Sequence, residues 1–194
     1  NRGDVSPTHG MGPACQLLNI HRGDRMKYLV AMDSDPISLP EYLKEHGKGT
    51  EAQKLQNGEI TLTLIRTEKG KTIQIEHNVA SPRPYSRLYQ LTGTKGFADK
   101  YPVEGYALNS KDLPQEITKE QVFTAHEYMP EEIKSQLMNQ YKDPIIKTME
   151  ENGLCLKYIF ITHGHRWTRR YGLHYGLKIN LLPTSRITVR HGRL

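Results

Sequence analysis

Residues 60–78 read ITLTLIRTEKGKTIQIEHN, and this stretch decides the expected fold. Apolar and polar side chains alternate over residues 60–64 and again over residues 72–76. Alternation with a period of two is typical of a β-strand that has one apolar and one polar face. Between the two runs, Glu68-Lys69-Gly70-Lys71 suits a tight turn. The stretch therefore predicts a β-hairpin with one apolar face and one polar face.

Strands are also expected on both sides of this hairpin. Residues 25–33 form an apolar run that reads as a mostly buried strand. Residues 86–92 alternate again, Gly93-Thr94-Lys95-Gly96 provides a turn, and residues 97–108 continue as further strand. Because short turns rather than helices join these strands, the pattern predicts an antiparallel meander.

Three helices are expected around the strands. Residues 7–20 carry apolar side chains at helical spacing, and this helix puts His9 in its first turn. A short helix is expected over residues 39–46, and Pro130-Glu131-Glu132 opens another that continues to Tyr141. Together the elements predict an α+β fold, an open and mainly antiparallel sheet with helices on one face.

The composition is typical of a globular domain, since 36% of the 194 residues are hydrophobic and 25% are charged. No apolar stretch approaches the ~20 residues that span a bilayer, so no membrane segment is expected. The two cysteines, Cys15 and Cys155, support neither a disulfide framework nor a cysteine metal site. His163 and His165 have metal-ligand spacing without a third ligand, and no metal is expected.

Positive charge is concentrated at the end of the chain. Residues 1–150 carry a net charge of −1, whereas residues 151–194 carry +7. Interleaved aromatic residues such as Trp167 and Tyr171 favour one interpretation, a basic tail that binds nucleic acid or an acidic surface. In a second interpretation, a codon-compatible one-base shift from Trp167 gives Gly-His-Gly-Gly-Met-Asp followed by a helical pattern. We therefore expect the tail to be out of frame, from somewhere after about Met149, and poorly ordered.

Two short segments carry side chains suited to proton transfer. His9 lies in Pro7-Thr8-His9-Gly10, and Tyr85 lies in Ser81-Pro82-Arg83-Pro84-Tyr85-Ser86-Arg87. Pro and Gly restrict or redirect the backbone in both segments, as is common where loops carry function. Taken alone, His9 is more simply a surface histidine and Tyr85 a half-buried aromatic residue. Arg83 and Arg87 either clamp a sugar or an anion, or are solvated or salt-bridged.

These segments, with Leu18-Asn19-Ile20-His21-Arg22-Gly23-Asp24-Arg25, resemble in order and spacing the second half of glycoside hydrolase family 109. These NAD-dependent α-N-acetylgalactosaminidases belong to the glucose-fructose oxidoreductase and inositol dehydrogenase superfamily. The resemblance implies a bacterial enzyme of carbohydrate metabolism, with residues 1–150 as its C-terminal substrate and oligomerisation domain. It also implies that NAD is bound mainly by an N-terminal Rossmann domain missing from this chain. No Gly-x-Gly-x-x-Gly segment follows any expected strand.

The resemblance further implies the chemistry. In this family, bound NAD oxidises the sugar at C3, which acidifies the C2 proton and allows elimination of the glycosidic group; water then adds and the hydride returns. The scheme needs a proton acceptor and a proton donor, and the family motifs place catalytic roles on His9 and Tyr85. Ser6, Pro7 and Thr8 join these two in contacting the substrate. Ser6 stands where the family has a tyrosine, and it is the expected contact to NAD.

The family's other active-site histidine, in a Gly-Gly-His-Gly-Gly motif, is found here only in the shifted reading near Trp167. We therefore expect a fragment of an α-N-acetylgalactosaminidase that is inactive alone. The alternatives are a fragment of an NAD-dependent sugar dehydrogenase and, less favoured, a basic-tail nucleic-acid-binding module. Expected partners are an N-acetylgalactosamine-containing glycan, NAD and a second copy bound through the open sheet face. The compartment stays open between the periplasm or secretion and the cytoplasm.

Overall fold

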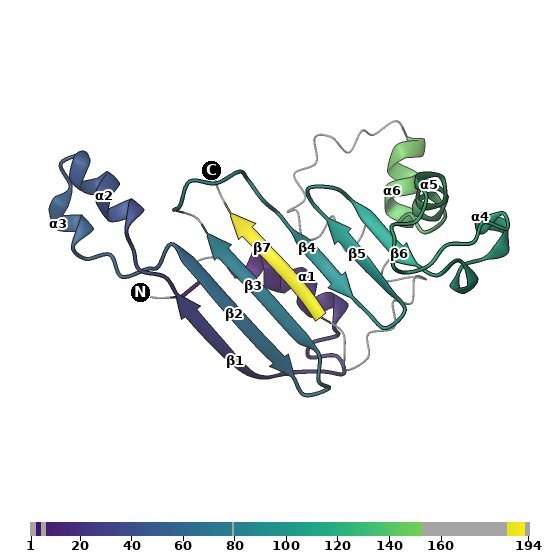
Figure 1. Ribbon diagram of the computed structural model, residues 1–194, viewed down its shortest axis with the longest axis horizontal. Helices are drawn as coiled ribbons and strands as arrows, with labels where there is room; N and C mark the ends of the chain where they lie inside the picture. Colours follow the sequence, from purple (N-terminus) through teal and green to yellow (C-terminus); the bar gives the residue numbers. More distant parts are fainter. Residues whose placement is uncertain (1–2, 5–6, 79, 153–185, 193–194) are drawn as a thin grey trace.

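A computed structural model describes residues 3–4, 7–78, 80–152 and 186–192 of the chain. Within these residues, seven strands form one sheet in the order β1-β2-β3-β7-β4-β5-β6 (Figure 1). Helix α1 lies against one face of the sheet, and helices α5 and α6 lie beside β6, whereas α2 and α3 stand beyond the end of β1 (Figure 1). The predicted α+β class, with an open and mainly antiparallel sheet, is confirmed.

Neighbouring strands in the sheet are antiparallel except for β3 and β7, which run parallel. The predicted meander is wrong at one point, because β7 lies between β3 and β4. This strand comes from the segment expected to be a basic tail, and residues 153–185 of that segment lie outside the described residues. The strands are β1 Met26–Asp33, β2 Ile60–Thr67, β3 Thr72–Asn78, β4 Tyr89–Thr92, β5 Gly96–Lys100, β6 Gly105–Leu108 and β7 Arg186–Gly192.

The three predicted helices are confirmed as α1, α2 and α5. Pro130 directly precedes α5, and Glu131 and Glu132 occupy its first turn, where carboxylates interact favourably with the helix dipole. Nothing among the described helices is long and apolar enough to cross a membrane. The helices are α1 Thr8–Leu17, α2 Ser38–Glu45, α3 Gly49–Ala52, the 3-10 helix η1 Ser110–Asp112, α4 Gln115–Thr118, α5 Glu131–Gln140 and α6 Pro144–Glu151.

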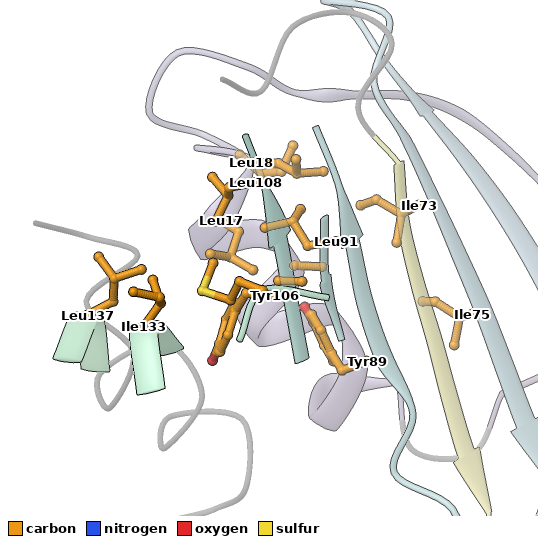
Figure 2. Packing of buried hydrophobic residues seen from close by; sticks show 14 of the residues in the cluster. Leu17, Leu18, Ile73, Ile75, Tyr89, Leu91, Tyr106, Leu108, Ile133 and Leu137 are labelled. Atoms are coloured by element: carbon orange, nitrogen blue, oxygen red, sulfur yellow. The ribbon is translucent and has the colours of Figure 1, made fainter. Parts of the chain in front are cut away.

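The core lies between the sheet and helices α1 and α5 (Figure 2). Leu18, which follows α1, contributes a fully buried side chain, as do Ile73 of β3, Leu91 of β4 and Ile133 of α5. Burying one such side chain completely stabilises the fold by roughly 1.5–3 kcal/mol. These residues come from distant parts of the sequence, so the core ties the N-terminal helix to the strands that follow it.

The predicted hairpin is confirmed as β2 and β3, but its single apolar face is wrong. Ile73 and Ile75 of β3 point into the core, whereas Leu62 and Leu64 of β2 are 43% and 56% exposed. Leu62 pairs with Glu76 across the ladder and therefore lies on the face opposite to the core. The inner face of β2 instead carries buried threonines and one isoleucine, namely Thr61, Ile65 and Thr67.

Strand β1 forms where it was expected, but the prediction that it is mostly buried is wrong. Seven of its eight residues are exposed. The strand lies at the edge of the sheet with β2 as its one neighbour, and its residues do not belong to the core cluster. An apolar run predicts a strand, but burial also requires an element packed upon it.

Candidate functional site

The first turn of α1 presents three of the predicted site residues to solvent. The Pro7 carbonyl accepts hydrogen bonds from the backbone N–H groups of Gly10 at 3.1 Å and Met11 at 2.8 Å, which starts the helix. His9 lies in this first turn, as predicted, and Pro7, Thr8 and His9 are exposed. The turn thus offers an imidazole and a hydroxyl to a ligand. Ser6, the predicted NAD contact, lies outside the described residues.

Residues 3–4, just before this turn, are held against the carboxyl ends of two strands. Nδ1 of His77, on β3, lies 3.3 Å from Oδ1 of Asp4, and the two side chains are 4% and 11% exposed. The Gly3 N–H donates to Oδ2 of Asp33, at the end of β1, at 3.1 Å. These two contacts fix residues 3–4 at the sheet, three residues before Pro7 in the sequence.

Tyr89 joins the start of α1 to the start of β4. Its hydroxyl donates to the Gly10 carbonyl at 3.5 Å, and its ring is buried in the core (Figure 2). Burial raises the pKa of Tyr89 well above the usual 10.0, and the nearby Cys15 thiolate charge would raise it further. Burial also raises the pKa of the Cys15 thiol. Burial therefore favours the neutral form of both groups.

Tyr85 is half-buried, and two side chains hold it in place. One is Arg87 of the same segment, and the other is Tyr101, which directly follows β5. Nε of Arg87 donates a hydrogen bond to the Tyr85 hydroxyl, and the Arg87 guanidinium carbon lies 5.4 Å from the centre of the Tyr85 ring. The Tyr101 hydroxyl donates to the Tyr85 carbonyl. The rings of Tyr85 and Tyr101 pack edge to face with centroids 6.1 Å apart, in the favourable T-shaped arrangement.

The Pro-rich segment that carries Tyr85 is braced against β3. Arg83 forms an ion pair with Glu76 at 2.9 Å, and both side chains are less than one-fifth exposed. The Asn78 side-chain oxygen accepts hydrogen bonds from the Ser81 hydroxyl at 2.7 Å and from the Ser81 N–H at 3.3 Å. These contacts, added to the prolines, leave the segment few alternative conformations.

The two arginines of this segment were expected either to clamp a ligand or to be solvated or salt-bridged. Arg83 is salt-bridged to Glu76, whereas Arg87 contacts Tyr85. Sequence reasoning missed Tyr101 and His77 altogether. Tyr101 gave no signal beyond being an aromatic residue before a proline, and His77 reads as one more polar position of an alternating strand. Only the paired strands bring them to these segments.

The remaining candidate residues do not form a metal centre in the part of the chain that is described. Among those residues, no group of three His, Cys, Asp or Glu side chains is arranged to hold a metal ion. His163 and His165 lie outside the described residues. Within the described ranges, the candidate residues lie in two segments, an exposed histidine turn and a braced tyrosine segment. Histidine and tyrosine side chains are suited to proton transfer and hydrogen bonding.

The chain is similar in sequence to known proteins over most of its length. Residues 1–155 match the family model described as glycosyl hydrolase 109, C-terminal domain. The chain is 56% identical over 153 residues to glycosyl hydrolase family 109 protein 1 of Phocaeicola vulgatus, covering 78% of this chain and 32% of the relative. It is 53% identical over 154 residues to glycosyl hydrolase family 109 protein 1 of Bacteroides thetaiotaomicron, and 54% over 154 residues to a family 109 protein of Porphyromonas gingivalis. Both matches cover 79% of this chain and 33% of the relative. The chain thus spans about a third of the length of the curated relatives it matches.

Proposed function

Because the chain belongs to glycoside hydrolase family 109, and matches the family's C-terminal domain, we propose that it is the sugar-binding part of an NAD-dependent α-N-acetylgalactosaminidase. The family match over residues 1–155 is the observation that carries the proposal. Residues 1–150 form the substrate domain in this proposal. Most contacts to NAD would come from sequence that corresponds to the two-thirds of the relatives' length that this chain does not match.

His9 and Tyr85 are the proposed proton-transfer residues, and Pro7 and Thr8 contact the sugar beside them. The exposure of the His9 turn supports this assignment, because an imidazole at a helix N-terminus is accessible to a hydroxyl-bearing ligand. NAD, when bound, would take up and return the hydride of the sugar. No glycine-rich phosphate-binding loop occurs among the described residues. In this proposal they therefore supply part of the NAD site rather than all of it. Ser6 is the proposed contact on this side.

The test of this proposal is sugar binding by the 194-residue chain. Methyl α-N-acetylgalactosaminide would be titrated, with and without NAD, and followed by changes in the NMR signals of His9 and Tyr85. We expect both residues to respond, and His9→Ala to weaken binding. His21→Ala is the matched control, because His21 is also exposed but follows the other end of α1. Equal responses to methyl α-glucoside would remove the proposed preference for an N-acetylgalactosaminide.

We also propose that this chain does not turn over glycosides by itself and that its tail is out of frame. The family match ends at residue 155, which supports a change in the sequence near the expected position. Sequencing the coding DNA from about residue 140 and translating its three frames tests the second statement. A neighbouring frame interrupted by stops would make the tail genuine.

The proposal that the chain does not turn over glycosides has its own test. Glycoside cleavage by the chain mixed with NAD would refute it, and release of reduced NAD alone would favour the dehydrogenase alternative.

A second copy of the chain is the proposed partner of the outer sheet face. Tyr28, Val30 and Met32 of β1 lie beside Leu62 and Leu64 of β2 on that face, and all five are at least 43% exposed. Contiguous exposed apolar surface of this kind is typical of a protein interface. Sedimentation of the chain should show a dimer or larger assembly that dissociates in Leu64→Lys. A Leu64→Lys variant that sediments like the unchanged chain would contradict the assignment.

A further inference from the structure

The hydrogen bond between Arg87 and Tyr85 has a defined polarity. A guanidinium carries only N–H groups and stays protonated at every accessible pH, so it can donate but cannot accept. The Tyr85 oxygen is therefore the acceptor in this contact. A phenol has a single hydrogen, and the bond from Arg87 occupies an oxygen lone pair without using that hydrogen. The hydroxyl hydrogen of Tyr85 is consequently available to another acceptor.

The cation beside the phenol also favours donation. The guanidinium carbon lies 5.4 Å from the Tyr85 ring centre, so the positive charge sits against both the ring and its oxygen. A hydrogen bond received from a cation polarises the phenol and strengthens the next hydrogen bond that it donates. An approaching ligand group that must itself donate a hydrogen bond to Tyr85 meets an oxygen already engaged by a charged donor.

Tyr101 contacts the backbone and the ring of Tyr85. Its hydroxyl donates to the Tyr85 carbonyl, and its ring packs edge to face against the Tyr85 ring. Tyr101 has a φ of 81°, a left-handed conformation that a bulky side chain rarely adopts. Residues held in such conformations cluster at functional sites. Backbone and ring of Tyr85 are thus fixed by one neighbour while its hydroxyl is oriented by the other.

We propose that Arg87 and Tyr101 are positioning residues that present the Tyr85 hydroxyl as a hydrogen-bond donor to an oxygen lone pair of the bound sugar. The inference rests on the proposed function, in which Tyr85 contacts an N-acetylgalactosaminide. Arg87 acts through Tyr85 rather than on the ligand, which distinguishes it from a residue that clamps an anion. The sugar oxygen facing Tyr85 is then an acceptor, such as the glycosidic oxygen or the acetamido carbonyl.

The experiment uses the 194-residue chain labelled with ¹⁵N-arginine and compares Tyr85→Phe, Arg87→Gln and Arg87→Lys with the unchanged protein. The Nε–H signal of Arg87 should shift in Tyr85→Phe, because the acceptor oxygen is gone. Affinity for methyl α-N-acetylgalactosaminide should fall about tenfold in Arg87→Gln and in Tyr85→Phe. The double variant should lose no more, since each change removes the same oriented hydrogen bond from Tyr85 to the sugar. Arg87→Lys keeps a cationic donor and should recover part of the affinity.

Arg25→Gln is the control, because Arg25 forms an exposed ion pair with Glu68 and lies outside the segment that carries Tyr85. It should leave sugar affinity within about twofold of the unchanged chain. Sugar binding that is lost in Tyr85→Phe and retained in Arg87→Gln would overturn the inference and leave the proposed function intact. Absence of binding in the unchanged chain would overturn both. An Arg87 Nε–H signal with the same chemical shift in Tyr85→Phe as in the unchanged chain would also overturn the inference, whatever the measured sugar affinity.

Discussion

Strands β1 and β2 form an open edge of the sheet, and strands β4 to β6 form a covered half (Figure 1). In the open edge, Val30 is 64% exposed and Leu64 is 56% exposed. In the covered half, Leu91 is fully buried and Leu108 is 4% exposed. The strands of both regions are rich in apolar residues, so apolar content alone does not distinguish them. The difference is what lies on top of the strands.

The covered half has neighbours on both faces. Helices α1 and α5 pack on the inner face, where Leu91 and Ile133 share one cluster. On the outer face, Tyr128 lies over the sheet: its ring is 6.4 Å from that of Phe97, and a Cβ added to Gly105 would meet it at 2.5 Å. Nothing comparable covers the outer face of the open edge within the described residues. The burial of a strand therefore depends more on the elements that pack against it than on its own composition.

The largest expected effect comes from the ion pair that anchors the open edge to α1. Lys71 Nζ lies 3.3 Å from Asp24 and donates to the Leu18 carbonyl at 3.2 Å, with side chains of the pair 9% and 1% exposed. Lys71→Met leaves a buried carboxylate without its cation and should lower the free energy of unfolding by about 3–5 kcal/mol in urea titrations. Lys119→Met, which removes an exposed pair with Glu132, should cost at most about 1 kcal/mol. Equal losses would mean that the open edge has no such anchor.

A matched pair of leucines tests the comparison itself. Leu91→Ala opens a cavity in the covered half and should lower the free energy of unfolding by about 3 kcal/mol. Leu64→Ala on the open edge removes an exposed side chain and should cost about 0.5 kcal/mol or less at a protein concentration where the chain is monomeric. Chemical denaturation of both variants measures the difference. A large loss in Leu64→Ala under these conditions would show that the outer face is covered within the monomer.

Acid should weaken the open edge through Asp24. Burial by itself would raise the pKa of Asp24, but hydrogen bonds from the Lys69 backbone, Thr67, the Arg25 backbone and Lys71 lower it below the usual 3.8. A carboxyl with a lowered pKa stabilises the fold above its unfolded pKa, and this contribution is lost as the pH falls through the folded value. Asp24→Asn should therefore flatten the decline in stability below about pH 4. An acid decline of unchanged slope would assign it to other carboxyls.

Alkali should act on the covered half instead, with the smallest effect. Burial raises the pKa of Tyr89, so its neutral form stabilises the fold below the unfolded pKa near 10.0 and this contribution fades as the pH rises toward the folded value. Tyr89→Phe should cost about 1 kcal/mol at neutral pH, through the lost bond to the Gly10 carbonyl. It should also be less sensitive than the unchanged chain above about pH 10, as thermal unfolding would report. Tyr42→Phe, an exposed tyrosine, provides the control.

Part of the candidate site could be predicted from sequence because its signals are local. His9 follows Pro7 at a helix start, and the Pro-rich segment around Tyr85 restricts its own backbone, so both were recognisable without a partner. The catalytic roles of His9 and Tyr85 stay predictions. Arg87 was noticed but not assigned to Tyr85, and Tyr101 lies sixteen residues from Tyr85 in the chain. A contact between two segments that only the sheet brings together has no local sequence pattern in either segment, so the sequence does not predict it.

The sequence by itself determined the local elements: the hairpin of β2 and β3, the starts of α1 and α5, and the turn between β4 and β5. These depend on periodicity and turn residues within a few positions. Only the tertiary structure decided that Thr61 is buried while Leu62 is exposed, and that Arg87 and Tyr101 meet at Tyr85. The reason is physical. A strand has two faces by its geometry, but which face becomes the core depends on the helices and strands that pack against it.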